Sequence, residues 1–249
     1  MADHTTPGAV ILIPARLASE RFPRKVLASE TGKPLIQHVY EAASRAASAA
    51  RVVIATDADE VHEAVRAFGG ESVMTDAAHP NGTSRLAQAA TLLDLPDESI
   101  VVNVQGDEPE IEPAVIDAAV AALGDAPMST VGSPFAADED PANPNIVKVV
   151  AGQDGRALYF SRALVPHDRD NTGHAAATPT KHVGLYVYRR DFLQTYSTLP
   201  PTPLEQTEKL EQLRVLEHGY RINVAICQTR HHGIDTPEQY AAFVERTRD

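Results

Sequence analysis

Short apolar runs alternate with helical patterns along the first two-thirds of the chain, and this alternation is the strongest constraint on its fold. The runs at 9–13, 51–55 and 100–104 each hold at least three consecutive Val, Ile or Leu residues, as is typical of buried parallel strands. Between them apolar residues recur at helical spacing, in the sets Ile36, Val39, Tyr40 and Ala43; Val61, Ala64, Val65 and Phe68; and Leu86, Ala89, Ala90 and Leu93. We therefore expect an α/β fold of three layers, with helices on both faces of a central sheet.

The second half of the chain has a pattern typical of antiparallel strands. The β-rich runs 146–150 and 157–160 flank Gln153-Asp154-Gly155, a turn sequence that predicts a hairpin. Residues 182–188 are a further strand candidate. The central sheet should therefore be mixed, and mostly parallel.

Turn and cap residues predict where several helices begin and end. Pro34 fits the first position of a helix, and Gly69-Gly70 fits the stop of the next one. Residues 205–218 have the pattern of one helix that ends at Gly219, and residues 237–246 have that of a last helix.

Size and composition favour one ordinary soluble domain. A chain of 249 residues with 43% apolar and 22% charged residues can bury a large core, so we expect one domain over 1–249, with 1–7 as a flexible tail. The net charge of -12 argues against broad binding to nucleic acid or to an anionic membrane, although a local basic pocket can still bind phosphates. No apolar stretch approaches the roughly 20 residues of a membrane-spanning helix. The start of the chain has no basic region of a signal peptide, so we expect a cytoplasmic location.

The single cysteine and the histidines give little sign of disulfide or zinc chemistry. Cys227 alone excludes an intramolecular disulfide and a multi-cysteine zinc site, and its place after the apolar run 222–226 favours a buried structural thiol. His218, His231 and His232 match no motif, and we interpret them as surface residues. A histidine-based zinc site lacks both the spacing and the cysteines.

A loop rich in positive charge follows the first predicted strand. Residues 14–25 read Pro-Ala-Arg-Leu-Ala-Ser-Glu-Arg-Phe-Pro-Arg-Lys and come at the carboxyl end of that strand, where α/β sheets bind ligands. Arg16, Arg21 and Lys25 suit a triphosphate, because Arg supplies forked donors and Lys a point charge for its oxygens. A solvated surface loop is the alternative that this segment alone leaves open.

Two aspartates are candidate metal ligands. Asp107 comes just past the run 100–104, at a strand end where a carboxylate can hold Mg²⁺ against phosphate oxygens. Taken alone, an aspartate after a strand is usually a turn residue or a helix cap, and Asp235 in Asp-Thr-Pro also has the pattern of a helix N-cap. The residues alone do not decide between these interpretations.

The order of motifs resembles that of the sugar-acid cytidylyltransferases. Ile-Pro-Ala-Arg at 13–16, followed by Ser-x-Arg-x-Pro-x-Lys at 19–25, is similar to the signature loop of that family. Further motifs follow in the family's order over nearly the whole chain and resemble most the members that act on 3-deoxy-manno-octulosonate (Kdo). They are Asn-Gly-Thr-Ser-Arg at 81–85, Asn-Val-Gln-Gly-Asp-Glu-Pro at 103–109, Asn-Pro-Asn at 143–145 with Val147-Lys148, Tyr-Phe-Ser-Arg at 159–162, His-Val-Gly-Leu-Tyr at 182–186, Leu-Glu-Gln-Leu-Arg at 210–214 and Gly-Ile-Asp-Thr-Pro-Glu at 233–238.

The resemblance implies a Rossmann-like nucleotidyltransferase (GT-A-like) fold with a site for CTP. The residues that match the family's nucleotide contacts are Pro14, Ala15, Arg16, Ser19, Arg21, Lys25, Thr83, Ser84, Arg85, Gln105 and Gly106. The resemblance also implies that Asp107 and Asp235 coordinate the catalytic Mg²⁺, and that Arg16 and Lys25 join them as catalytic residues.

On the acceptor side, the positions that match the family's Kdo contacts are Arg162, His182, Tyr186, Glu211 and Gln212. Arg162 can pair with the carboxylate of the sugar, and the others can form hydrogen bonds with its hydroxyls. Without the resemblance, a core histidine, a strand tyrosine and an exposed helix face would be the plainer interpretations.

Two positions depart from the family's pattern. Ser84 stands where the family usually has an acidic residue, so the contact to the base is expected to differ. Arg24 stands where the loop usually has Gly; if that position takes a positive φ, an arginine imposes strain or a changed loop path.

The implied reaction is an in-line attack of the anomeric hydroxyl of Kdo on the α-phosphorus of CTP, with pyrophosphate leaving, in lipopolysaccharide biosynthesis. We identify no general base. Other acceptors that stay open are 8-amino-Kdo, a sialic acid and a polyol phosphate; a nucleotide-binding regulator without catalysis is the alternative from another class. Residues 162–170 resemble the part of the family that pairs subunits, so we expect a homodimer. The polar segment 170–180 is expected to be a mobile loop.

Overall fold

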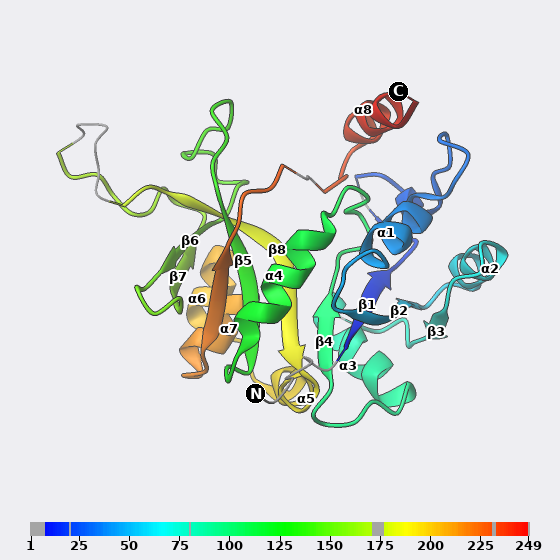
Figure 1. Cartoon of the computed structure of the whole chain (residues 1–249), viewed down its shortest axis with the longest axis horizontal. Helices are drawn as coiled ribbons and strands as arrows, with labels where there is room; N and C mark the ends of the chain where they lie inside the picture. Colours follow the sequence, from blue (N-terminus) through cyan, green and yellow to red (C-terminus); the bar gives the residue numbers. More distant parts are fainter. Residues whose placement is uncertain (1–7, 20, 80, 171–176, 231–232, 249) are drawn as a thin grey trace, which may run out of the picture.

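The computed structural model describes residues 8–19, 21–79, 81–170, 177–230 and 233–248. These residues form a mixed nine-stranded sheet with helices on both faces, so the expected three-layer α/β architecture is confirmed (Figure 1). The strands are β1 (Ala9–Ala15), β2 (Ala49–Thr56), β3 (Ser72–Met74), β4 (Ile100–Asn103), β5 (Met128–Pro134), β6 (Lys148–Ala151), β7 (Ala157–Ser161), β8 (Thr180–Arg189) and β9 (Ile222–Ile226). The helices are the short 3₁₀ helix η1 (Lys25–Leu27), α1 (Leu35–Ala43), α2 (Asp59–Ala67), α3 (Gly82–Leu92), α4 (Pro113–Leu123), α5 (Arg190–Thr198), α6 (Pro203–Glu208), α7 (Gln212–Glu217) and α8 (Pro237–Arg248).

The sheet is parallel on one side and mixed on the other. Its strand order is β3-β2-β1-β4-β8-β5-β9, and four of the six neighbouring pairs along this order are parallel. β8 lies antiparallel between β4 and β5. β6 and β7 form the predicted antiparallel hairpin, which joins β8 through the pair Lys148 and Lys181. The predicted mixed sheet is therefore confirmed.

Alternate residues of the central strands are buried on opposite faces of the sheet, as the two-residue period of a strand requires. In β1, Ile11 and Ile13 belong to the apolar layer covered by α1, α2 and α4, whereas Leu12 belongs to the layer covered by α3, α5 and α7. The stripes of apolar residues predicted at helical spacing supply this cover; Val39 and Val65 are fully buried.

The structure corrects several predicted helix boundaries. The single helix expected at 205–218 is wrong: the segment forms α6 and α7, because Lys209 takes a left-handed conformation with φ 54° and ends the first helix. The second helix then ends before Gly219, which has φ 79° as a stop residue allows. Pro34 lies just outside α1 rather than at its first position, since its ψ of 145° is extended. The sequence patterns do not predict β3, α4, β5 or α5.

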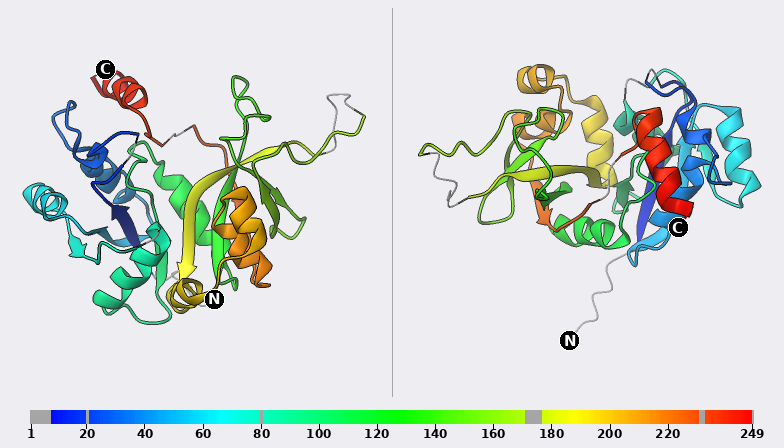
Figure 2. Two further views of the ribbon diagram at one scale, coloured as in Figure 1. Left: turned by 180° about the vertical axis from the view of Figure 1, so that it is seen from behind. Right: turned by 90° about the horizontal axis from the view of Figure 1, so that it is seen from above.

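The last helix returns to the start of the chain. Tyr240, Phe243 and Val244 of α8 pack with Leu35 of α1 and with Phe22 of the loop 14–25, which we call the basic loop. Figures 1 and 2 show α8, in red, close to the blue N-terminal elements. This packing carries the segment before α8, with Asp235, to the carboxyl edge of β1.

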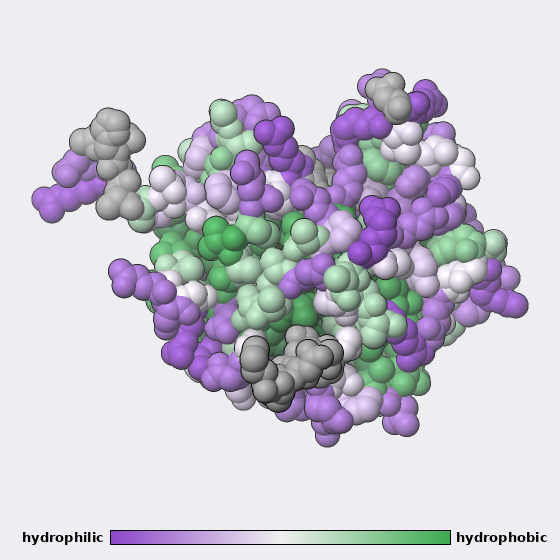
Figure 3. Space-filling view, in the orientation of Figure 1, coloured by the Kyte–Doolittle hydropathy of each residue, from purple (hydrophilic) through white to green (hydrophobic). Residues whose placement is uncertain are grey.

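Figure 3 shows hydrophobic residues gathered over the middle of one face, where α4 lies, and hydrophilic residues around the periphery.

Cys227 is only half-buried, although burial raises the pKa of its thiol. No described helix is long and apolar enough to cross a membrane. The expected tail at 1–7, residues 171–176 of the expected loop, and His231 and His232 lie outside the described residues; the rest of that loop ends where β8 begins at Thr180.

Candidate active site

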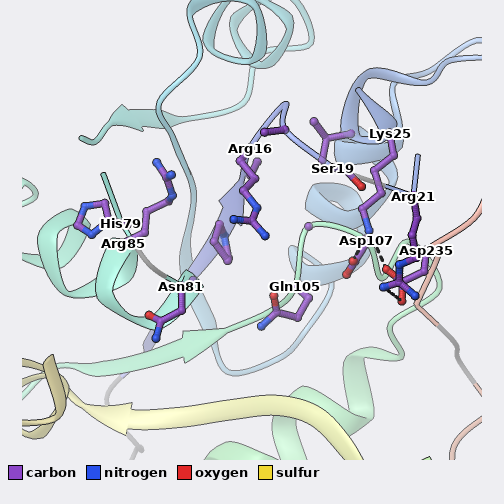
Figure 4. A pocket seen from close by; sticks show the side chains of 16 residues that line it. Arg16, Ser19, Arg21, Lys25, His79, Asn81, Arg85, Gln105, Asp107 and Asp235 are labelled. Carbon is purple, nitrogen blue, oxygen red and sulfur yellow. Dashed lines mark hydrogen bonds and ion pairs between the residues drawn. The ribbon is translucent and has the colours of Figure 1, made fainter. Parts of the chain in front are cut away.

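A cavity of about 780 Å³ opens at the carboxyl ends of β1 and β4 (Figure 4). This volume is in the range of sites for small molecules. We call it the basic cavity, and its lining residues are Pro14, Ala15, Arg16, Ala18, Ser19, Arg21, Lys25, Val26, His79, Asn81, Gly82, Arg85, Gln105, Gly106, Asp107 and Asp235. Nine of the eleven predicted nucleotide contacts are among them, together with both predicted metal ligands.

The basic loop brings three cations to this cavity. Arg16 directly follows β1, is exposed, and makes no hydrogen bond or ion pair with another described residue. Arg21 is also exposed, with its Nη2 3.0 Å from Oδ2 of Asp235. Lys25 begins η1, and its side chain is only 12% exposed. The loop therefore offers two open guanidinium groups and one enclosed ammonium group.

Lys25 joins the two predicted metal ligands. Its Nζ donates to Oδ2 of Asp107 at 2.6 Å, to Oδ1 of Asp235 at 3.1 Å and to the carbonyl oxygen of Ile234 at 2.9 Å. Figure 4 shows both carboxylates converging on the ammonium group. These three residues are far apart in the sequence, and they meet because α8 packs back onto the N-terminal elements.

Burial raises the pKa of the Asp107 carboxyl, and the nearby negative charge of Asp235 acts in the same direction. The positive charge of Lys25 opposes this shift. The two carboxylates share the ammonium of Lys25, and Asp235 also pairs with the exposed Arg21, so this part of the cavity attracts cations. Asp235 is available for this because Thr236, not Asp235, accepts the cap hydrogen bond from the backbone N–H of Gln239 at 3.3 Å. The alternative that Asp235 is only a helix cap is therefore not supported.

A glycine allows the two loops of the cavity to approach each other. A Cβ atom on Gly106 would lie 2.7 Å from the carbonyl oxygen of Pro14, which is closer than real Cβ contacts come. Any other residue at 106 would push the loop after β4 away from the loop after β1. Gly106 therefore sets the width of the cavity between Pro14 and Gln105.

Arg24 adopts the conformation that the familiar glycine would allow. Its φ is 60° and its ψ is 20°, in the left-handed region, so the loop path is kept and the arginine carries the strain. The guanidinium group turns to Glu60 in α2, with which it forms a double ion pair. Arg24 is not one of the residues that line the basic cavity.

The start of α3 meets the cavity with one of its three predicted residues, Arg85, and with two that were not predicted. Asn81 and Gly82 line it, whereas Ser84 donates its hydroxyl to the carbonyl oxygen of Asn81 at 3.0 Å, and Thr83 donates to Oε2 of Glu211 at 3.3 Å. Arg85 does line the cavity; its Nη1 donates to Oγ1 of Thr75 at 2.6 Å. Base contacts by Thr83 and Ser84 stay a prediction.

The predicted acceptor residues form a second region beside the cavity, on one face of β8. The side chains of His182 and Tyr186 share this face, with ring centroids 5.4 Å apart. Glu211 and Gln212 reach it from the start of α7. We call these four residues the β8 polar face; the hydrogen bond between Glu211 and Thr83 links it to α3.

The β8 polar face is half-buried, except for the buried Gln212, and is electrically neutral over much of its surface. Burial lowers the pKa of His182 to about 3 and raises that of Tyr186 well above its usual value, so both are uncharged near neutral pH. Burial also raises the pKa of Glu211. The Nε2 atom of Gln212 is buried and has no hydrogen-bond partner among the described residues, so it is a donor free for a ligand.

Arg162, the remaining predicted acceptor residue, lies among backbone carbonyls. Its Nε donates to the carbonyl oxygen of Glu208 at 2.7 Å, and its Nη1 to that of Pro144 at 3.2 Å. Its Nη2 reaches the carbonyl oxygen of Lys209 at 3.4 Å. A guanidinium group has five N–H donors, so two remain for a carboxylate.

Sequence reasoning missed five residues that line the cavity: Ala18, Val26, His79, Asn81 and Gly82. Asn81 and Gly82 begin the motif Asn-Gly-Thr-Ser-Arg at 81–85, and the preference of Asn for helix N-caps indicates the turn that faces the cavity. His79 carries no comparable signal.

Among the described residues, no group of three or more His, Cys, Asp and Glu side chains is arranged to hold a metal, so any ion here would depend on the substrate for further ligands.

Comparison with known proteins agrees with this geometry. The sequence model of the cytidylyltransferase family matches residues 10–222. A 3-deoxy-manno-octulosonate cytidylyltransferase of Geobacter metallireducens is 50% identical, over 94% of this chain and 96% of its own. One of Syntrophobacter fumaroxidans is also 50% identical, over 94% of each chain.

The fold is also that of a solved relative. The structure of a CMP:2-keto-3-deoxy-manno-octonic acid synthetase in complex with CTP superimposes with a TM-score of 0.89, at 42% identity, over 96% of this chain and 98% of the other. Matches of this extent, in sequence and in structure, leave no major part of the chain outside the comparison. The chain belongs to the 3-deoxy-manno-octulosonate cytidylyltransferase family.

Proposed function

We propose that this protein transfers CMP from CTP to Kdo, with release of pyrophosphate. The observation that carries the proposal is the junction of Lys25, Asp107 and Asp235 at the end of the basic loop, together with the β8 polar face that the hydrogen bond between Thr83 and Glu211 links to α3. One part of the site suits a triphosphate and the other a polyhydroxylated acid. The anomeric hydroxyl of Kdo attacks the α-phosphorus in line and releases its proton. The bond between the α-phosphorus and the oxygen that bridges to the β-phosphate breaks as the new bond forms, and this oxygen leaves with pyrophosphate.

The chain contributes mainly charge and position to this reaction. Arg16 and Arg21 are exposed and can move onto the β- and γ-phosphates, where they would stabilise the charge of the leaving pyrophosphate. Lys25 is held in place by three hydrogen bonds and would meet the phosphate chain at a fixed point. Positioning of two reactants next to each other is itself a large part of the rate enhancement in such transfers.

Asp107 and Asp235 fit a Mg²⁺ ion. Mg²⁺ is usually bound by one or two carboxylates and by phosphate oxygens of the substrate, and these two side chains already converge on one cation. When bound, Mg²⁺ would neutralise phosphate charge and make a nearby hydroxyl more acidic. Removal of divalent cations with a chelator should abolish turnover, and added Mg²⁺ should restore it.

The β8 polar face would bind the acceptor. Tyr186 and the free Nε2 of Gln212 can donate to sugar hydroxyls, while Glu211 can accept from them. The two remaining donors of Arg162 would pair with the sugar carboxylate.

A homodimer through residues 162–170, a cytoplasmic location and a place in lipopolysaccharide biosynthesis are parts of the same proposal. Sedimentation of the purified protein tests the dimer.

Pyrophosphate release tests the proposed function. The purified protein is incubated with Mg²⁺, with CTP or UTP as donor, and with Kdo, 8-amino-Kdo or a sialic acid as acceptor. We expect the fastest release with CTP and Kdo. Faster release with another acceptor would reassign the substrate, and binding of CTP without release under any condition would identify a regulator.

A further inference from the structure

β8 contains a bulge at the polar face. Thr130 of β5 pairs with Tyr186, but the next residue, Val131, pairs with Val183, so one step along β5 spans three residues of β8. The two extra residues are Gly184 and Leu185. β4 pairs only with residues 186–189, so the bulge lies where β4 ends and the loop with Asp107 begins. Bulges at such places redirect side chains toward a site.

The hydroxyl of Thr130 fills this bulge. Thr130 is fully buried, and its Oγ1 lies 2.7 Å from the carbonyl oxygen of Leu185 and 3.3 Å from that of Val183. The same oxygen lies 2.9 Å from Nε2 of His182. The side chain therefore contacts Leu185 inside the bulge, Val183 at its edge, and His182, which comes just before the bulge.

These contacts determine which nitrogen of His182 carries the proton. A threonine hydroxyl has one hydrogen, and a carbonyl oxygen can only accept. The nearer carbonyl therefore takes the hydroxyl proton of Thr130, and Oγ1 is left to accept from a proton on Nε2. If Nε2 accepted instead, Oγ1 would face two buried carbonyl oxygens without a hydrogen between them, which is costly.

With the proton on Nε2, the Nδ1 atom of a neutral His182 is purely an acceptor. No hydrogen bond joins Nδ1 to another described residue, and the ring is framed by Phe160 and Tyr186, at centroid distances of 5.0 and 5.4 Å. The low pKa of His182 is consistent with a ring that stays neutral. The ring thus has a fixed orientation and one open acceptor atom.

We propose that Thr130 is a positioning residue of the acceptor site, which holds the β8 bulge and fixes the Nε2–H tautomer of His182 so that Nδ1 accepts a hydrogen bond from a hydroxyl of the acceptor sugar. The inference rests on the proposed function for the identity of that sugar. It concerns recognition of the acceptor alone, because Thr130 is not among the residues that line the basic cavity.

The matched variants are Thr130→Val, which keeps the shape and removes the hydroxyl, and Thr130→Ser, which keeps the hydroxyl. We expect Thr130→Val to raise the KM for Kdo about tenfold, the equivalent of one lost hydrogen bond. The KM for CTP should stay within about twofold. Thr130→Ser should regain most of the affinity for Kdo. An unchanged KM for Kdo in a folded Thr130→Val protein, or equal rises for both substrates, would overturn the proposal.

Ring-nitrogen NMR of isotope-labelled histidine in the full-length protein tests the tautomer without any substrate. The proposal requires the His182 resonances of an Nε2–H ring in the wild type and in Thr130→Ser; an Nδ1–H ring would refute it even if Thr130→Val does not fold. This measurement also separates the two claims. A protein with the Nε2–H tautomer but no turnover of Kdo would contradict the proposed function and leave the tautomer established.

Discussion

In the basic cavity, the decisive side chains are charged and carried on loops, and two of them are exposed, whereas on the β8 polar face they are half-buried or buried, largely uncharged and held on a strand and a helix. Arg16 and Arg21 are exposed, but His182 and Tyr186 sit behind neighbouring rings. A triphosphate attracts cations over several ångströms, so its ligands need not be fixed in advance. A sugar is recognised by the direction of each hydrogen bond, and such ligands must be fixed by packing and second contacts.

The sharpest test of this contrast lies in the two carboxylates of the basic cavity. Asp107→Asn and Asp235→Asn keep the size of the side chain and remove the charge that pairs with Lys25. We expect each to lower kcat about 10²–10³-fold, as the loss of one preorganised electrostatic contact does, with an unchanged melting temperature. Steady-state kinetics and thermal unfolding measure the two effects.

Asp94→Asn is the control for these variants. Asp94 is exposed and has φ 50°, a conformation that Asn also tolerates, so this variant should retain wild-type turnover. Near-normal rates in both Asp107→Asn and Asp235→Asn would remove these carboxylates from the mechanism. They would also contradict the claim that the basic cavity acts through its charged side chains.

A pH series probes the enclosed character of the β8 polar face. The pKa of His182 is about 3 in the folded protein, against an ordinary value of 6.5. Between these values only the unfolded chain binds the proton, so stability should fall as pH falls below about 6.5. Partial exposure of the ring reduces the effect, and we expect His182 to contribute a loss of about 1 kcal/mol between about pH 7 and pH 5.

Urea unfolding of the wild type and of His182→Asn at the two pH values measures this contribution. The variant should lose less stability on acidification than the wild type. His218→Asn, which changes a half-buried histidine at the end of α7, should behave like the wild type. Equal losses in the wild type and in His182→Asn would mean that the ring is as open to protons as the side chains of the cavity.

The smallest effect is expected at Arg24, where the loop carries strain outside the cavity. Arg24→Gly removes a left-handed arginine, which costs about 1–2 kcal/mol, but adds the chain entropy of glycine, about 0.5–1 kcal/mol. It also removes an exposed ion pair with Glu60, and solvent screening makes the contribution of such a pair to stability small. These effects nearly cancel, so the free energy of unfolding should change by less than about 1 kcal/mol.

Denaturant unfolding measures this, with Glu60→Gln as the variant that loses only the ion pair. The KM for CTP should change less than about threefold in Arg24→Gly, because Arg24 does not line the cavity. A larger rise would show that Arg24 contacts the nucleotide directly.

The contrast between the two regions also explains what could be predicted from the sequence. β1, β2, β4 and the helices after them follow from uninterrupted Val and Ile runs and from amphipathic stripes. α4 escaped detection because its sequence, PAVIDAAVAAL, is apolar almost all round and has little helical contrast. The charged residues of the cavity could also be predicted from local sequence patterns, because they follow strand ends or belong to recognisable motifs.

The β8 polar face depends on features that no local pattern contains. The break at Lys209, which brings Glu211 and Gln212 to the start of α7, interrupts an otherwise continuous helical pattern. Thr130 lies in β5, a strand that the patterns do not predict, and its role follows from a shift in register between strands about 50 residues apart. Such tertiary relations become visible only in the folded chain.

Transfer of a labelled phosphate tests the central claim most directly. The protein is incubated with Kdo, Mg²⁺ and CTP labelled either in the α-phosphate or in the γ-phosphate, and the products are separated. We predict that the α-label moves with CMP onto Kdo and that the γ-label appears only in pyrophosphate. Label from the γ-phosphate on the sugar, or α-label that stays in CTP while Kdo is present, would contradict the account.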